Sequence, residues 1–285
     1  MINFTERLSK CYTGVVHDIM RDMEYTNFTL PPEIKPCKNK HVIAGQIFTI
    51  EGEVDKNQTH HESLLAWTGF LSKAPKDKVI ICQPNTNEVA LMGELSAETL
   101  QLRGIRGYIV DGGSRDMDFI LKIDFPVWSK FYTPRDVVKF WKPTKFEKQI
   151  NIGAVTINNN DYVLADIDGV IIIPQDNIEN ILIKSEEKIN SENLVRKAIK
   201  EGVDPQEAYK KYSAFLVYLN FFSFNKKYML RIAHTLTLLI LNLTCFNYYS
   251  KLWSFRSSFF SLIVTIVVIV SPIKTGLGNL NLSKP

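Results

Sequence analysis

Acidic residues are missing from the last part of this 285-residue chain. The segment from Ser213 to Pro285 contains seven Lys and Arg residues and no Asp or Glu. Of the 34 basic and 30 acidic residues in the whole chain, 27 and 30 therefore fall in residues 1–212, a net charge of −3. This asymmetry predicts a domain of residues 1–212 and an apolar, basic tail of residues 213–285. The charge of the domain gives no reason to expect nucleic-acid binding.

Cysteine is also scarce, and its spacing argues against cysteine-based sites. Cys11, Cys37, Cys82 and Cys245 are far apart and form no CxxC pair. A disulfide framework or a zinc site is therefore not expected, and reduced thiols in the cytoplasm are the better interpretation. The N-terminus lacks the basic, apolar and small-residue succession of a secretory signal.

Two stretches of the tail carry no formal charge: 19 residues between Arg231 and Lys251, and 17 residues from Ser257 to Ile273. The second is at the short end of what spans a bilayer, and the first is diluted by Asn and hydroxyl residues. Two interpretations stay open: a membrane hairpin within residues 229–273, or an extension without a selected structure. A third interpretation of the tail is that Leu262 to Val270 forms a β-rich, aggregation-prone segment.

Residues 1–212 have the pattern of an α/β domain. Short apolar or alternating stretches predict strands at Val42–Val54, Val79–Cys82, Ile105–Val110, Pro126–Ser129, Ala154–Ile157, Tyr162–Asp166 and Val170–Ile173. Helical spacing predicts helices at Phe4–Met23, His60–Leu71, from Glu94, from Asp116 to Ile123, and at Ile178–Tyr212 with a break at Gly202 to Pro205. Thr13 is a candidate cap for a helix start within the first segment. The alternation of helix and strand favours parallel sheet units.

The stretch from Gly93 to Asp116 carries the main functional signal. It predicts a helix, a buried strand and a sharp turn at Gly112 and Gly113, which ends in Arg115 and Asp116. These two charges would lie at the carboxyl end of a strand, where open α/β sheets bind ligands. An adjacent Arg and Asp can also be no more than a solvated turn.

The chemistry of these residues fits a 2-oxo acid. A guanidinium matches a carboxylate, and an aspartate is a hard oxygen ligand for Mg2+ or Mn2+. The helix opening at Glu94 to Ser96 would add backbone amides that suit an anion, and Glu94 is the nearest carboxyl group for moving a proton. A cation would stabilise the enolate formed when a bond beside the keto group breaks. His60 and His61 point to different faces of a helix and make a poor chelate.

Several motifs together resemble those of a known family. They are Gly93-Glu94-Leu95, then Asp111-Gly112-x-x-Arg115-Asp116, Phe125-Pro126-Val127, Leu30-Pro31-Pro32, Thr133-Pro134-Arg135-Asp136 and Asp166-x-Asp168-Gly169-Val170. In order and spacing they resemble the RraA-like family, which includes the 4-hydroxy-4-methyl-2-oxoglutarate/4-carboxy-4-hydroxy-2-oxoadipate aldolases. The resemblance extends over nearly all of residues 5–212.

The resemblance implies a swivelling β/β/α fold, a homotrimer or a dimer of trimers, and active sites between subunits. It implies that Asp116 binds the divalent cation, that Arg115 contacts and orients the substrate, and that the amides of Leu95 and Ser96 receive the pyruvyl carboxylate. Glu94 falls where aldolase members carry an acid associated with proton transfer. The expected function is a metal-dependent lyase that cleaves 4-hydroxy-2-oxo acids or decarboxylates oxaloacetate through a pyruvate enolate.

One departure from the family pattern concerns the metal shell. Many members have an acid three positions after the metal-binding aspartate, where this chain has Phe119; Asp118 would be rotated by about 100° on a helix. An acid from a neighbouring subunit is expected instead, with Glu186, Glu187 and Glu192 as unranked candidates. Another family member inhibits an RNA-degrading enzyme by binding it, so a non-catalytic, trimeric protein-binding module is the alternative function. No glycine-rich S-adenosylmethionine loop is present.

Overall fold

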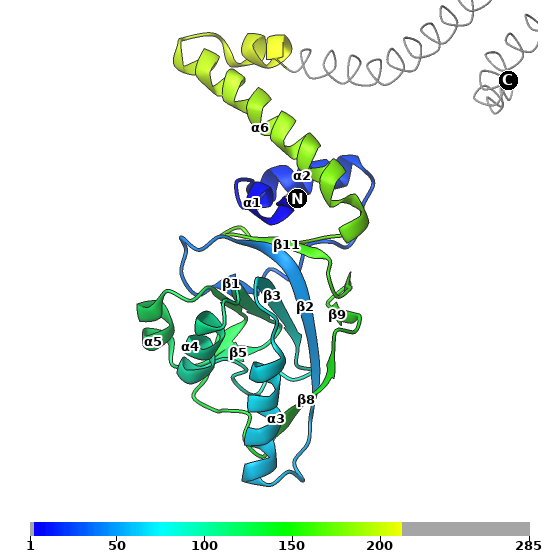
Figure 1. Cartoon of the computed structure of the whole chain (residues 1–285). Coiled ribbons are helices and arrows are strands. Elements are labelled where there is room, and N and C mark those ends of the chain that lie inside the picture. The colour runs from blue at the N-terminus through cyan, green and yellow to red at the C-terminus, as the bar shows by residue number, and fades with distance from the viewer. Residues whose placement is uncertain (1–2, 213–285) are drawn as a thin grey trace, which may run out of the picture. The chain divides into compact units, whose positions relative to one another are not determined.

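The computed structural model describes residues 3–212. An eight-stranded, curled sheet runs through this part of the chain, and the helices pack against it in two groups (Figure 1). Within it, no helix is long and apolar enough to cross a membrane. The interpretations of the tail at residues 213–285 lie outside the described residues.

The strands of the main sheet follow the order β1-β6-β4-β3-β2-β11-β12, and β8 pairs with β2. Their bounds are β1 Lys35–Pro36, β2 Ile43–Val54, β3 Lys78–Gln83, β4 Gly107–Val110, β6 Val127–Ser129, β8 Trp141–Phe146, β11 Tyr162–Ala165 and β12 Val170–Ile173. Two smaller sheets pair β9 Ile150–Ile152 with β10 Val155–Ile157, and β5 Gly113–Ser114 with β7 Phe131–Tyr132.

The centre of the sheet is parallel. Strands β2, β3, β4 and β6 run in one direction, which confirms the parallel units predicted from the order of helices and strands. Their side chains alternate between two cores: Ile80 and Tyr108 pack on one face, and Ile81 and Ile109 on the other. The carboxyl ends of the parallel strands consequently meet at one edge of the sheet, where Arg115 and Asp116 follow β4 and β5.

The helices form two groups. Helices α3 His60–Lys73, α4 Glu94–Leu102 and α5 Met117–Ile123 bury side chains in the core that contains Tyr108. Helices α1 Phe4–Leu8, α2 Thr13–Asp22 and α6 Ile178–Lys200 build a third core with β11 and β12, and Figure 1 shows α1, α2 and the start of α6 together beside β11. A short 3-10 helix, η1 Gln175–Asn177, precedes α6, and residues 205–212 are helical.

The interpretation of Thr13 as a helix cap is wrong. The capping position of α2 is Tyr12, whose side chain makes no capping bond, and Thr13 is the first helical residue. Asp166, in the turn between β11 and β12, instead accepts hydrogen bonds from the backbone amide of Thr13 at 2.8 Å and from its hydroxyl at 2.7 Å. A carboxylate that is distant in sequence thereby satisfies an amide that the helix itself leaves unpaired.

Between residues 93 and 116, glycine is needed mainly where neighbouring atoms leave no room for a side chain, and less because of the backbone conformation of a turn. Gly104 has φ +75° and directly follows Arg103, the capping residue at the end of α4. Gly112 and Gly113 do not have positive φ, so the sharp turn does not depend on a left-handed glycine. A Cβ on Gly113 would lie 2.6 Å from Phe131 Cε2 and 2.9 Å from the carbonyl oxygen of Val89. The glycine at position 113 is therefore required by the close approach of β7 and the segment before α4.

Candidate active site

Two segments that are far apart in sequence meet at the carboxyl edge of the sheet. The backbone amide of Leu91 donates to the carbonyl of Gly113 at 2.8 Å, and the amide of Arg115 donates to the carbonyl of Met92 at 2.9 Å. These bonds place the start of α4 beside the loop that carries Arg115 and Asp116. The backbone therefore brings Glu94, Arg115 and Asp116 close together at this edge.

Asp116 is held through one of its two carboxylate oxygens. Its Oδ2 accepts a hydrogen bond from the backbone amide of Glu94 at 3.1 Å and lies 3.4 Å from Arg115 Nε. Its Oδ1 accepts no hydrogen bond from any residue that the structure describes. The backbone of Asp116 has φ +56° and ψ +42°, a left-handed conformation that Asp tolerates better than most residues and that is frequent at functional sites. Asp116 therefore presents one fixed and one free oxygen.

Gly93 allows this arrangement. A Cβ at position 93 would lie 2.7 Å from Asp116 Oδ2 and 3.2 Å from both Cγ and Nε of Arg115. The φ of Gly93 is −148°, an extended conformation open to any residue, so the need for glycine is one of space. The sequence pattern includes Gly93, but the pattern alone does not show this contact.

Arg115 is held by the segment after β7. Its Nη1 lies 3.4 Å from Asp136 Oδ2 and 3.4 Å from the carbonyl oxygen of Pro134. The Thr133-Pro134-Arg135-Asp136 motif therefore borders the site, a position that its sequence alone does not indicate. The side chains of Arg115, Asp116 and Asp136 are between 36% and 41% exposed, so solvent and small solutes reach them. Nη2 of Arg115 makes no hydrogen bond within residues 3–212.

The first turn of α4 offers backbone donors. The amide of Glu94 is used by Asp116, whereas the amides of Leu95 and Ser96 have no acceptor among the residues described. The Leu95 side chain is exposed, and the buried hydroxyl of Ser96 accepts a hydrogen bond from Trp67 Nε1 at 2.8 Å, which fixes α4 against α3. The Glu94 carboxylate has no partner within the described residues, so it is free to reach a ligand.

Within residues 3–212, no cluster of three or more His, Cys, Asp and Glu side chains is arranged to hold a metal ion. Asp116 would be the ligand that this site offers, with water or another subunit completing the shell. Asp118 and Phe119 are both exposed, and the structure adds no acid in their place. His60 and His61 lie exposed in the first turn of α3, between Thr59 and Glu62 of its capping box.

The three glutamates considered for a neighbouring subunit lie on α6. Glu186 is engaged within its own chain by Arg7, with both nitrogen–oxygen distances at 2.8 Å. Glu192 accepts a hydrogen bond from the hydroxyl of Tyr12. Glu187 has no partner among the described residues, and the contribution of any of the three across a subunit interface stays a prediction.

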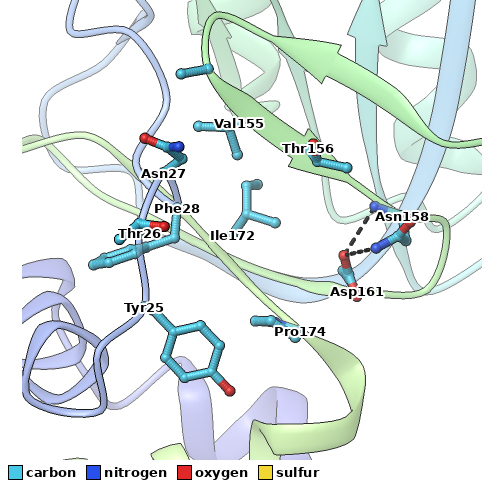
Figure 2. A pocket seen from close by; sticks show the side chains of 11 residues that line it. Tyr25, Thr26, Asn27, Phe28, Val155, Thr156, Asn158, Asp161, Ile172 and Pro174 are labelled. Atoms are coloured by element: carbon cyan, nitrogen blue, oxygen red, sulfur yellow. Dashed lines mark hydrogen bonds between the residues drawn. The ribbon is translucent and has the colours of Figure 1, made fainter.

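A cavity of about 270 Å³ lies away from this site, between residues 25–28 and the strands β10 and β12 (Figure 2). Its most buried polar group, Asp161, accepts hydrogen bonds from the backbone amide and the side-chain amide of Asn158 and from the backbone amide of Gln175. No candidate site residue lines this cavity, so it gives no support to a second catalytic centre.

Known proteins resemble this chain over about three quarters of its length. Protein DlpA of Legionella pneumophila is 26% identical over 216 residues, 74% of this chain, but the chain spans only 34% of the length of that relative. A Halalkalibacterium halodurans protein named "Putative 4-hydroxy-4-methyl-2-oxoglutarate aldolase" is 25% identical over 73% of this chain and 94% of its own length.

The fold also matches a solved structure and a described family. Streptomyces coelicolor RraAS2, described as an unusual member of the RNase ES inhibitor RraA protein family, matches with a TM-score of 0.61 and 18% identity; the match covers 68% of this chain and 96% of RraAS2. The family described as RraA-like, Aldolase/RraA, matches residues 13–172. Those residues include Glu94, Arg115 and Asp116, and the chain belongs to the RraA-like family.

Proposed function

We propose that this chain is a metal-dependent carbon–carbon lyase that acts on 2-oxo acids. Its reaction would be the cleavage of 4-hydroxy-2-oxo acids of the 4-hydroxy-4-methyl-2-oxoglutarate type, with oxaloacetate decarboxylation as a companion activity. The observation that carries the proposal is the pairing of Asp116, with its free Oδ1, and Arg115, with its free Nη2, beside the unpaired amides of α4.

The site fits a divalent cation such as Mg2+ or Mn2+. Oxygen ligands suit these hard cations, and Mg2+ usually keeps several waters and needs only one or two carboxylates. Asp116 Oδ1 is such an oxygen, and the bonds to Oδ2 hold the carboxylate in place before a cation binds. When bound, the cation supplies Lewis-acid polarisation of the keto oxygen of the substrate.

The residues of the chain would do the remaining work. Arg115 Nη2 and the amides of Leu95 and Ser96 bind the substrate carboxylate and orient it. Glu94, directly or through water, accepts the proton of the 4-hydroxyl as the bond between C3 and C4 breaks and the C4 carbonyl forms. A proton returned to C3 of the pyruvate enolate gives pyruvate. In oxaloacetate the same bond breaks with loss of carbon dioxide.

The comparisons support this proposal at a coarse level. A relative that is 25% identical over nearly its whole length carries an aldolase name, and the family description includes aldolases.

Three exposed apolar side chains lie on α4 and α5, close to the site in sequence: Leu95, Leu102 and Phe119. We also propose a homotrimer or a dimer of trimers, the assembly that the resemblance to the RraA-like family implies, in which a neighbouring subunit closes the site and meets these side chains.

The experiment is an assay of pyruvate release from oxaloacetate by the purified full chain with Mg2+ or Mn2+, with and without a chelator. The proposal expects release above the rate of a protein-free sample with the same cation, and this excess should be lost with the chelator. Release no faster than in the protein-free sample would favour the alternative, a non-catalytic protein-binding module that regulates an RNA-degrading enzyme, and an excess that survives the chelator would contradict the metal dependence. The similarity in fold to Streptomyces coelicolor RraAS2 is the observation behind that alternative.

A further inference from the structure

We propose that Asp136 is a positioning residue that orients the guanidinium of Arg115 for the substrate carboxylate. This inference rests on the proposed function and adds a residue that the sequence motifs leave without a role. Asp136 lies 20 positions after Asp116 in the chain, on a different loop, yet its Oδ2 is 3.4 Å from Arg115 Nη1.

The carboxylate of Asp136 is itself held in place. Its Oδ1 accepts a hydrogen bond from the backbone amide of Val138 at 3.1 Å, which leaves Oδ2 for Arg115. The loop around it is anchored on both sides. The carbonyl of Arg135 accepts from the amide of Ala90 at 2.8 Å, and the amide of Lys139 donates to Ser63 Oγ at 2.9 Å. The position of the Asp136 carboxylate is therefore set by backbone contacts that do not involve Arg115.

Two of the three nitrogens of the Arg115 guanidinium face acceptors. Asp116 Oδ2 faces Nε, while Asp136 Oδ2 and the carbonyl of Pro134 face Nη1. Nη2 has neither a hydrogen bond nor an ion-pair contact within the described residues. A fixed guanidinium plane gives geometric specificity toward a carboxylate, because the fork of an arginine binds only in defined directions. By engaging Nη1, Asp136 thus helps to leave Nη2 as the nitrogen that meets the substrate.

A purely structural role for this ion pair is a poor explanation. Both side chains are more than a third exposed, and ion pairs of this kind contribute little to folding. The loop keeps its other anchors when the Asp136 carboxylate is removed. The effect of losing it should therefore appear in substrate binding and not in stability.

The test compares Asp136→Asn with wild type in the full chain, using oxaloacetate as substrate and oxalate, a planar dianion similar to the pyruvate enolate, as a binding probe. Calorimetry at fixed Mg2+ gives the Kd of oxalate. We expect the Kd of oxalate and the KM of oxaloacetate to rise roughly tenfold, with a smaller change in kcat. About tenfold is the lower end of the loss seen when a residue that supports a binding group is removed. The matched control is Glu88→Gln, which removes the 2.7 Å ion pair between Glu88 and Arg135 on the same loop without touching Arg115.

A double-mutant cycle shows whether Asp136 acts through Arg115. In an Arg115→Ala background, Asp136→Asn should leave the Kd of oxalate unchanged, because the group it positions is gone. An equal loss in both backgrounds, a wild-type Kd and KM for Asp136→Asn, or the same loss in Glu88→Gln would overturn the inference. If wild type itself neither binds oxalate nor releases pyruvate, the proposed function fails, and the inference fails with it.

Discussion

Asp116 accepts a hydrogen bond through Oδ2 from the backbone amide of Glu94 at 3.1 Å. The contact joins the loop after β5 to the first turn of α4, and it places a carboxylate at the positive end of a helix. The same oxygen lies 3.4 Å from Arg115 Nε, so the two charged residues and the helix start form one unit. Changes to any of the three should therefore alter the site together.

Gly93→Ala should impair the site while it spares the fold. The new Cβ would lie 2.7 Å from Asp116 Oδ2 and would displace that carboxylate from the Glu94 amide. We expect the affinity for Mn2+, measured by electron paramagnetic resonance, to fall about tenfold or more. Gly14→Ala is the control, because its Cβ would meet only Tyr12 at an ordinary 3.6 Å. Equal Mn2+ affinity in both variants would contradict the proposed role of Gly93.

Arg115→Lys should lower kcat/KM for oxaloacetate roughly a hundredfold, because an ammonium group cannot reproduce the planar fork and the substrate is misplaced. The affinity for Mn2+ should change little, since Asp116 keeps its hydrogen bond to the Glu94 amide. Steady-state kinetics and Mn2+ titration measure the two effects separately. A variant with wild-type kcat/KM would exclude Arg115 from substrate binding.

Gly113→Ala should destabilise the domain. Its Cβ would lie 2.6 Å from Phe131 Cε2 and 2.9 Å from a backbone oxygen, and overpacking of this kind costs about 1–3 kcal/mol. Gly69→Ala is the matched control in α3, where a Cβ meets nothing within 4 Å. That change should stabilise by about 1 kcal/mol, because Ala favours helix over Gly. Chemical denaturation of both variants gives the comparison, and a neutral Gly113→Ala would show that β7 can move away.

Glu186→Gln should remove a pH-dependent part of the stability. The hydrogen bond and charge of Arg7 lower the pKa of Glu186 below its ordinary value of 4.5. A lowered folded-state pKa means that the contribution is present above the ordinary value and is lost as the pH falls through the folded-state value. Since the Glu186 side chain is 40% exposed, the difference from wild type at pH 7 should be no more than about 1 kcal/mol.

Denaturant unfolding at pH 7 and below pH 4 measures this difference for Glu186→Gln. Glu187→Gln provides the control, because Glu187 has no partner among the described residues. A difference that persists at low pH would show that the Glu186 pair with Arg7 is not its source.

Local patterns predicted most helices and strands in which apolar residues recur at regular spacing, but not the six-residue strand β8, whose sequence shows no regular alternation. Strand β2 and helix α4 were expected from alternation and helical spacing, and the placement of Arg115 and Asp116 after a buried strand followed from them. Strands β5 and β7 were not expected, because two residues are too few to show a period. The contacts of Asp166 with Thr13 and of Asp136 with Arg115 join distant loops, so neither is readable from local spacing.

Asp116→Asn provides the most direct test of the central claim, since it keeps an acceptor for the Glu94 amide but removes the charge that a cation needs. The measurement is the rate of pyruvate release from oxaloacetate across a titration of Mn2+. Wild type should show release that rises with Mn2+ and disappears with a chelator, and Asp116→Asn should stay at background throughout. Release that is unchanged by the chelator in wild type, or that is stimulated by Mn2+ equally in Asp116→Asn, would contradict the account.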